Sequence, residues 1–240
     1  MALLYPDARV PTNPEITGVL AQAAVAERRA GRKNGDDLHL ASTLLRIGSV
    51  THALAAIGVD PAQARARVEA QIEALPKRGW APLRVQMRMV RLVHHAADRA
   101  FGAGLAELDG PYLFATIVSL DENAGLLKAL ADVGFTLRAF RWYLAHGATS
   151  APPSPESGPV EVILHNDPFT SMPLVVEIMT SLFGKDAAAA QELMMRVHEE
   201  GRAQVAVLYA RDAAEKLARL RARADAEDAP LRATLSPVSS

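Results

Sequence analysis

Three polar side chains in the last third of the chain offer hydrogen-bond acceptors of different kinds. Asn166 carries an amide oxygen, Asp167 a carboxylate and His198, when neutral, a ring nitrogen. A protonated amine needs converging acceptors of this kind, because it is a cation with several N–H donors. Taken singly, an Asn-Asp-Pro sequence is most often a turn, and a lone histidine is most often an ordinary surface residue. The residue types therefore indicate an amine site only if the fold brings them together.

The segment that carries His198 also carries apolar side chains that can line a slot. Met194 lies three residues before Val197 and four before His198, so all three share one face of a helix. Methionine adapts to several shapes, which suits a pocket that accepts different side chains. Met194 and Val197 alone would more often be ordinary core residues.

Local patterns predict the elements that position these side chains. A β-branched run opens the segment as a strand, and a turn at His165 to Pro168 follows it. Thr170 or Ser171 can cap the next helix, and Asp186 the helix after that. The expected elements are a strand at 160–164, a helix to Phe183, a helix at 187–200, a strand at 203–209, a helix from Asp212 to about Asp228, and a strand at 230–235. This order, β-α-α-β-α-β, predicts a small α+β domain.

A proline-rich run divides the chain. Residues 148–159, ATSAPPSPESGP, contain four prolines among twelve residues and predict a semi-extended linker. It separates a domain at 1–147, with 17 basic and 14 acidic residues, from a domain at 160–240, with 9 basic and 12 acidic residues. The opposite net charges, +3 and −3, permit the two domains to dock on each other within the chain.

The first domain is expected to be helical throughout and internally repeated. The expected helices are 14–31, 38–45, 50–57 and 61–75, with Gly58 as a left-handed cap. Ala53 to Val59 reads ALAAIGV and Ala129 to Phe135 reads ALADVGF, while LASTLL at Leu40 has a counterpart, LFATIV, at Leu113. The offsets of 76 and 73 residues nearly agree, so we predict two units of four short helices, at about 13–75 and 84–146.

Residues 160–240 resemble the ClpS adaptor family over three motifs in the right order. The family's strongest motif is Asn-Asp-Asp, an aromatic residue and Thr-Pro-Met. The second is a helix end with Met, two variable residues, Val-His, two more and Gly, and the third is Pro-Leu-x-x-Thr-Leu. The matching segments are Asn166-Asp167-Pro168-Phe169-Thr170-Ser171-Met172, Met194 to Gly201, and Pro230, Leu231, Thr234 and Leu235.

The resemblance implies a recognition function. ClpS proteins bind N-degrons, which are proteins whose first residue is bulky and hydrophobic, and pass them to the ClpA-type AAA+ unfoldase of the ClpP protease. Asn166, Asp167 and His198 would then hold the free α-amine. The walls of the hydrophobic pocket would be Met172, Val175, Met194, Val197 and Leu231, with Leu164 and Thr170 near the rim. Binding should weaken as His198 protonates at mildly acidic pH, because a cation would face a cation.

Four positions depart from the family's pattern, among them Pro173, which replaces an acid near the start of the helix after the turn. Pro168 replaces an acid that helps to hold the amine in relatives, which should weaken amine binding. His165 stands where relatives usually carry an aliphatic residue at the pocket wall, so it should narrow the slot or change its preference. Ser171 replaces a proline at the start of the following helix. These departures motivate the alternative, a regulatory or structural module that modulates Clp assembly without binding degrons.

Residues 10–147 resemble the Clp amino-terminal repeat domain, a tandem of four short helices found in front of ClpA-type unfoldases. The resemblance rests on the helix pattern and the internal repeat, and it implies a docking platform for adaptors and substrates. The whole chain would then be a two-domain fusion, an all-α tandem repeat followed by a ClpS-like α+β domain.

Composition and missing motifs exclude several classes of protein. Twenty-six basic residues against 27 acidic ones lack the charge of a nucleic-acid binder, and no apolar run reaches the length of a membrane span. The chain has no Walker A, G-x-S-x-G or H-E-x-x-H motif and no cysteine, so we expect no enzyme activity, cofactor or metal. Without a signal-like amino terminus, the expected compartment is the cytoplasm.

Overall fold

The computed structural model describes residues 11–31, 36–77, 83–120, 123–148 and 157–238. It divides into two compact units, Met1–Leu144 and Ala145–Ser240. Most of the predicted proline-rich linker, residues 149–156, lies outside the described residues. The two units are described separately below.

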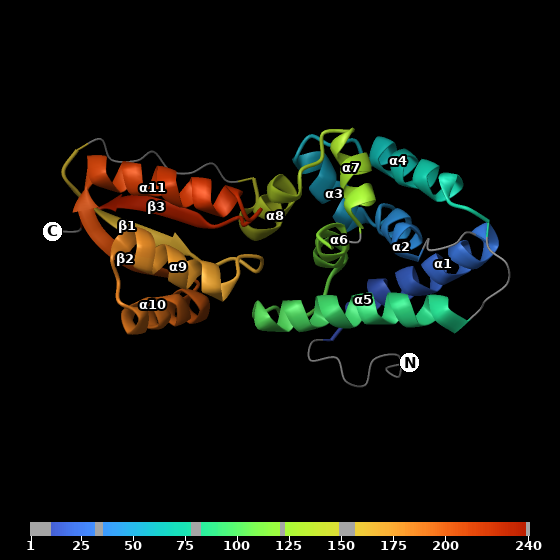
Figure 1. The fold of residues 1–240 in the computed structure, drawn as a ribbon, viewed down its shortest axis with the longest axis horizontal. Helices are drawn as coiled ribbons and strands as arrows, with labels where there is room; N and C mark the ends of the chain where they lie inside the picture. Colours follow the sequence, from blue (N-terminus) through green and yellow to red (C-terminus); the bar gives the residue numbers. More distant parts are fainter. Residues whose placement is uncertain (1–10, 32–35, 78–82, 121–122, 149–156, 239–240) are drawn as a thin grey trace. The chain divides into compact units, whose positions relative to one another are not determined.

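The first unit is helical, as predicted. Its helices are α1 Pro14–Ala30, α2 Asp36–Leu44, α3 Gly48–Ala56, α4 Pro61–Ala74, α5 Leu83–Gly102, α6 Gly110–Val118, α7 Ala124–Ala131 and most of α8 Leu137–His146, whose last two residues belong to the second unit. Helix α6 is buried along its whole length and contacts α2, α3, α5 and α7 (Figure 1). Phe114 of α6 packs edge-on against Phe135 and Phe140, which anchor the end of α7 and the start of α8. The tandem repeat remains a prediction.

The second unit has the predicted order of strands and helices. Its elements are β1 Pro159–His165, α9 Met172–Phe183, α10 Ala187–Glu200, β2 Arg202–Tyr209, α11 Ala210–Asp225 and β3 Arg232–Pro237. Within the described residues, the strands form an antiparallel three-stranded sheet in the order β2-β1-β3 (Figure 1). The α+β architecture expected for 160–240 is therefore confirmed.

Strand β1 lies in the centre of the sheet, and its side chains alternate between two environments. Val160, Val162 and Leu164 are buried, and they join the buried residues of α9, α10 and α11 in one apolar core. The intervening residues, among them Ile163 and His165, lie on the other face and are only partly buried. Because successive side chains of a strand point to opposite faces, this pattern places the helices on one side of the sheet.

Capping residues fix where the two site helices begin and end. Ser171 caps α9 and Asp186 caps α10, whose Asp186 Oδ1 accepts from the amide of Ala189 at 2.8 Å. Both helices end at a glycine with left-handed backbone angles, Gly184 at φ 65° and Gly201 at φ 79°. Two predicted elements are displaced by two to three residues: α11 runs from Ala210, directly after β2, to Asp225, and the last strand lies at Arg232–Pro237 instead of 230–235.

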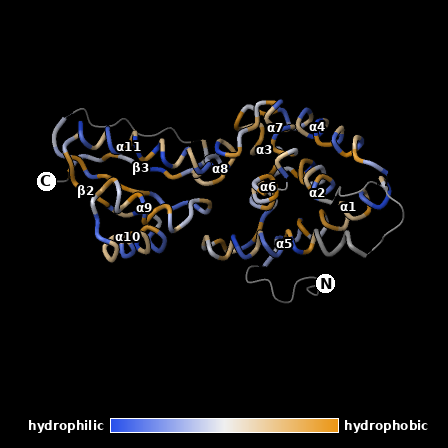
Figure 2. The backbone as a smooth tube through the Cα atoms, viewed as in Figure 1, coloured by the Kyte–Doolittle hydropathy of each residue, from blue (hydrophilic) through white to orange (hydrophobic). Residues whose placement is uncertain are grey.

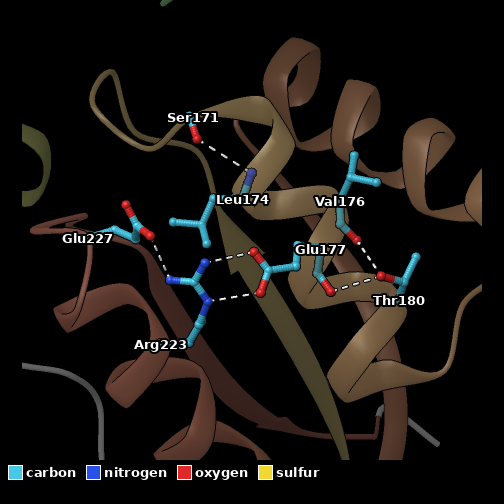
Figure 3. A network of polar contacts seen from close by, with 7 residues as sticks. All are labelled: Ser171, Leu174, Val176, Glu177, Thr180, Arg223 and Glu227. Atoms are coloured by element: carbon cyan, nitrogen blue, oxygen red, sulfur yellow. Dashed lines mark hydrogen bonds and ion pairs between the residues drawn. The ribbon is translucent and has the colours of Figure 1, made fainter.

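An ion pair joins α9 to α11 at the surface. The guanidinium of Arg223 donates to both carboxylate oxygens of Glu177 at 2.8 Å and to Glu227 at 3.0 Å (Figure 3). These bonds lower the pKa of Glu177 and raise that of Arg223. Figure 2 shows hydrophilic residues recurring along α11. The Arg223 and Glu177 side chains are 35% and 48% exposed, so this ion pair lies on a solvated surface.

Replacing the cap of α10 tests how firmly the helix is anchored. We expect Asp186→Ala to lower the free energy of opening of α10 by about 1 kcal/mol, because the amide of Ala189 loses its acceptor. Native-state hydrogen exchange of the α10 amides in the full chain measures this. Gln191→Ala, an exposed change on the same helix, is the control and should leave exchange nearly unaltered.

Candidate functional site

The loop between β1 and α9 is organised around the Asp167 carboxylate. Its Oδ1 accepts from the amides of Phe169 at 2.9 Å and Thr170 at 2.7 Å, and its Oδ2 accepts from the Thr170 hydroxyl at 2.6 Å. The side chain is buried, with 8% of the residue exposed. Asp167 therefore shapes the loop that carries the predicted amine-binding residues, and each of its oxygens accepts at least one bond from that loop.

A backbone hydrogen bond brings the two predicted acceptor segments together. The amide of Asn166 donates to the carbonyl of Gly201 at 2.8 Å, which continues the pairing of β1 with β2 by one residue. Gly201 closes α10, and His198 lies in the last turn of that helix. Asn166 is consequently held next to the helix end that carries His198, and both residues remain partly exposed.

The predicted pocket residues fall into two groups by burial. Leu164, Val175, Val197 and Leu231 are buried in the apolar core, with exposed fractions between 0% and 7%. Met194 is partly buried and packs against that core, while Met172 and Thr170 are partly exposed. The methionines are therefore the more accessible members of the predicted set, and the buried group belongs to the core.

A second group of polar residues, which the sequence did not connect, lies at the same end of the sheet. The Nε2 atom of His165 is 2.8 Å from the Thr234 hydroxyl, and Nε2 of His146 is 2.7 Å from the carbonyl of Pro230. Burial lowers the pKa of both rings, and the positive charge of Arg232 lowers both further. The sequence did not predict this group, because its members are brought together by strand pairing and by contacts between residues far apart in the chain.

Comparison with known proteins places this loop and helix pair in a family. The model of the ATP-dependent Clp protease adaptor protein ClpS matches residues 155–234. The ClpS protein of Oleidesulfovibrio alaskensis is 42% identical over 77 residues, which cover 32% of this chain and 74% of that protein. The chain belongs to the ClpS family. The ClpS protein of Nitratidesulfovibrio vulgaris is 42% identical over 77 residues, which cover 32% of this chain and 77% of that protein. The ClpS protein of Deinococcus radiodurans is 40% identical over 79 residues, which cover 32% of this chain and 69% of that protein.

Membership of the ClpS family gives the chain a coarse function. ClpS proteins are adaptors of the ATP-dependent Clp protease, and they deliver substrates without catalysing a reaction. The expectation that this chain is not an enzyme agrees with that family. The match begins at residue 155, so it does not include the helices of the first unit.

The described part of the chain shows neither a membrane-spanning helix nor a cluster of metal-binding side chains. Within those ranges, no helix has both the length and the apolar character to cross a membrane. The same ranges contain no group of three or more side chains placed to hold a metal ion.

Removing the Asp167 carboxylate tests the loop of this ClpS domain. Asp167→Ala leaves the amides of Phe169 and Thr170 without their acceptor, which should cost about 1–3 kcal/mol. We expect faster hydrogen exchange at both amides. Asp167→Asn retains an acceptor oxygen and should have a smaller effect, while Glu215→Ala, an exposed change on α11, should have none. Unchanged exchange at Thr170 in Asp167→Ala would contradict this account of the loop.

Proposed function

We propose that the ClpS domain of this chain recognises N-degrons, binding the free α-amine and the bulky hydrophobic side chain of a protein's first residue. Asn166 and His198 accept hydrogen bonds from the amine. The methionines Met172 and Met194 receive the side chain above Val175, Val197 and Leu231. Delivery to a ClpA-type AAA+ unfoldase of the Clp protease would follow.

The observation that carries this proposal is the hydrogen bond from Asn166 to the carbonyl of Gly201. It holds an amide side chain beside the turn of α10 that bears His198, so two neutral acceptors lie on neighbouring segments. Met194 precedes His198 by one helical turn and is partly exposed, which supports an apolar slot beside the amine.

Asp167 contributes to this site mainly by shaping it. Its oxygens accept from the amides of Phe169 and Thr170 and from the Thr170 hydroxyl, so much of its acceptor capacity serves the loop, while its negative charge still attracts the amine. Amine binding therefore depends more heavily on Asn166 and His198 than the residue types alone suggest. The same observation favours the second candidate function, a module that modulates Clp assembly without binding degrons.

We also propose that residues 1–147 are a Clp amino-terminal repeat-like domain that acts as a docking platform. The helical structure of the first unit supports this, together with the repeated ALAAIGV and ALADVGF sequences. The cytoplasm is the compartment in which such a fusion would meet its protease.

Binding of short peptides separates the two candidate functions. Fluorescence anisotropy of the full chain with peptides that begin with Leu, Phe, Tyr or Trp should show saturable binding, whereas Ala-first and acetylated peptides should not bind. His198→Ala should weaken binding at least about tenfold, because a hydrogen bond to a charged group is worth about 1.5–3 kcal/mol. Glu199→Ala, the exposed neighbour on α10, is the control. Equal affinity for acetylated and free peptides would refute degron recognition.

Restoring the family's acid provides a gain-of-function test. Pro168→Asp adds a carboxylate to the loop beside Asn166, and we expect it to tighten binding of a Phe-first peptide by several-fold. The gain should shrink at high ionic strength, because part of it is electrostatic attraction of the amine. Pro168→Ser, which adds no charge, is the matched control. If both variants bind equally, the acid at this position does not act on the amine.

A further inference from the structure

Three basic residues form a row across one end of the sheet. In the strand register, His165 of β1 pairs with Arg202 of β2 on one side and with Arg232 of β3 on the other. Residues paired in this way in an antiparallel sheet project from the same face. The row therefore runs Arg202, His165, Arg232 across all the strands of this sheet.

The row lies on the face opposite the apolar core. The buried residues of β1 are Val160, Val162 and Leu164, so His165 projects to the other side. Further along the same face, Val207 and Tyr209 of β2 pair with Glu161 and Pro159, and they are 50% and 71% exposed. This face therefore combines a basic end with exposed apolar side chains.

Like charges on directly paired positions add their positive potential on one face, which attracts carboxylates. The arginines stay charged at every physiological pH, because they do not lose their protons. After burial, the charges of Arg232, His146 and Arg202 lower the pKa of His165, in that order. Asp167 raises the pKa of His146, and its oxygens also accept hydrogen bonds from its own loop.

We propose that this outer face of the sheet binds an acidic segment of a partner protein, with carboxylates at the row and an apolar residue near Val207 and Tyr209. Guanidinium groups pair with carboxylates through two parallel hydrogen bonds. Adjacent strands are about 4.8 Å apart, so the row spans roughly 10 Å, which suits successive acidic side chains better than one small anion. Val207 and Tyr209 can also bury an apolar side chain of a peptide, which a free anion does not have.

This surface is separate from the proposed degron site, although both lie at the same end of the sheet. Asn166 and the buried wall residues belong to the loop and the core side, whereas His165 and its strand partners project from the other face. His165 therefore does not lie among the buried wall residues, contrary to what the family's pattern led us to expect, and a partner bound at the row would contact the face opposite them. The proposal stands whether or not the domain binds degrons.

An amino-terminally acetylated, fluorescein-labelled peptide that alternates leucine with glutamate tests the proposal on the full chain. Acetylation removes the free amine, so the peptide does not report on degron binding. At about 0.15 M salt we expect saturable binding that Arg202→Gln weakens about tenfold, the equivalent of losing one charge-assisted hydrogen-bonded contact. Arg219→Gln, which removes the same charge from an exposed site on α11, should change affinity less than about twofold.

The pH dependence provides a second readout. Binding should tighten as the pH falls from about 8 to about 6, because carboxylates favour the protonated form of His165. The groups that act on this ring are Arg202 on β2, Arg232 and Thr234 on β3, and His146. His165→Gln should abolish the pH dependence while retaining a neutral hydrogen-bonding side chain. A pH dependence that persists in His165→Gln would overturn the part given to this histidine.

Several outcomes would overturn the proposal itself. Equal weakening by Arg202→Gln and Arg219→Gln would show non-specific attraction, and equal binding of a leucine–glutamine peptide would show that charge is not recognised. If millimolar inorganic phosphate displaces the peptide and Val207→Ser leaves the peptide's affinity unchanged, the row is a simple anion site. Each variant's binding to a Phe-first peptide, measured alongside, checks folding where degron binding occurs, and circular dichroism checks it otherwise.

Discussion

The antiparallel register between β1 and β2 is the constraint on which the functional geometry depends. The pairing of His165 with Arg202 is continued by the hydrogen bond from Asn166 to Gly201, so the end of α10 is held against the loop that follows β1. A shift of one residue would turn His165 toward the core and Leu164 toward solvent. Both proposed binding surfaces would be lost by the same slip.

Burial on one side of the sheet makes such a slip costly. Leu164 and the other inward residues of β1 share a core with α9, α10 and α11, and the register irregularity between Val162 and Ile163 adjusts the pairing with β2. Ion pairing then adds a surface connection between α9 and α11 through Arg223 and Glu177. The helices that present Met172, Met194 and His198 are thus positioned mainly by apolar packing and by their caps.

Much of the second unit could be predicted because its signals are local. Ser171, Asp186, Gly184 and Gly201 mark helix ends through interactions within a few residues, and each of these boundaries is confirmed. The helix predicted to begin at Asp212 begins at Ala210, because the chain passes directly from β2 into α11 without an intervening loop.

The sequence by itself determined the α+β order of the carboxyl-terminal unit, the helical nature of the first, and the three motifs that mark a ClpS adaptor domain. These depend on residue types and short spacings. Only the tertiary structure decided that the Asp167 carboxylate accepts hydrogen bonds from its own loop, and that Arg202, His165 and Arg232 lie in one row. The reason is physical: hydrogen-bond partners and strand register join residues far apart in the chain, and the packed core selects one register among those that the sequence allows.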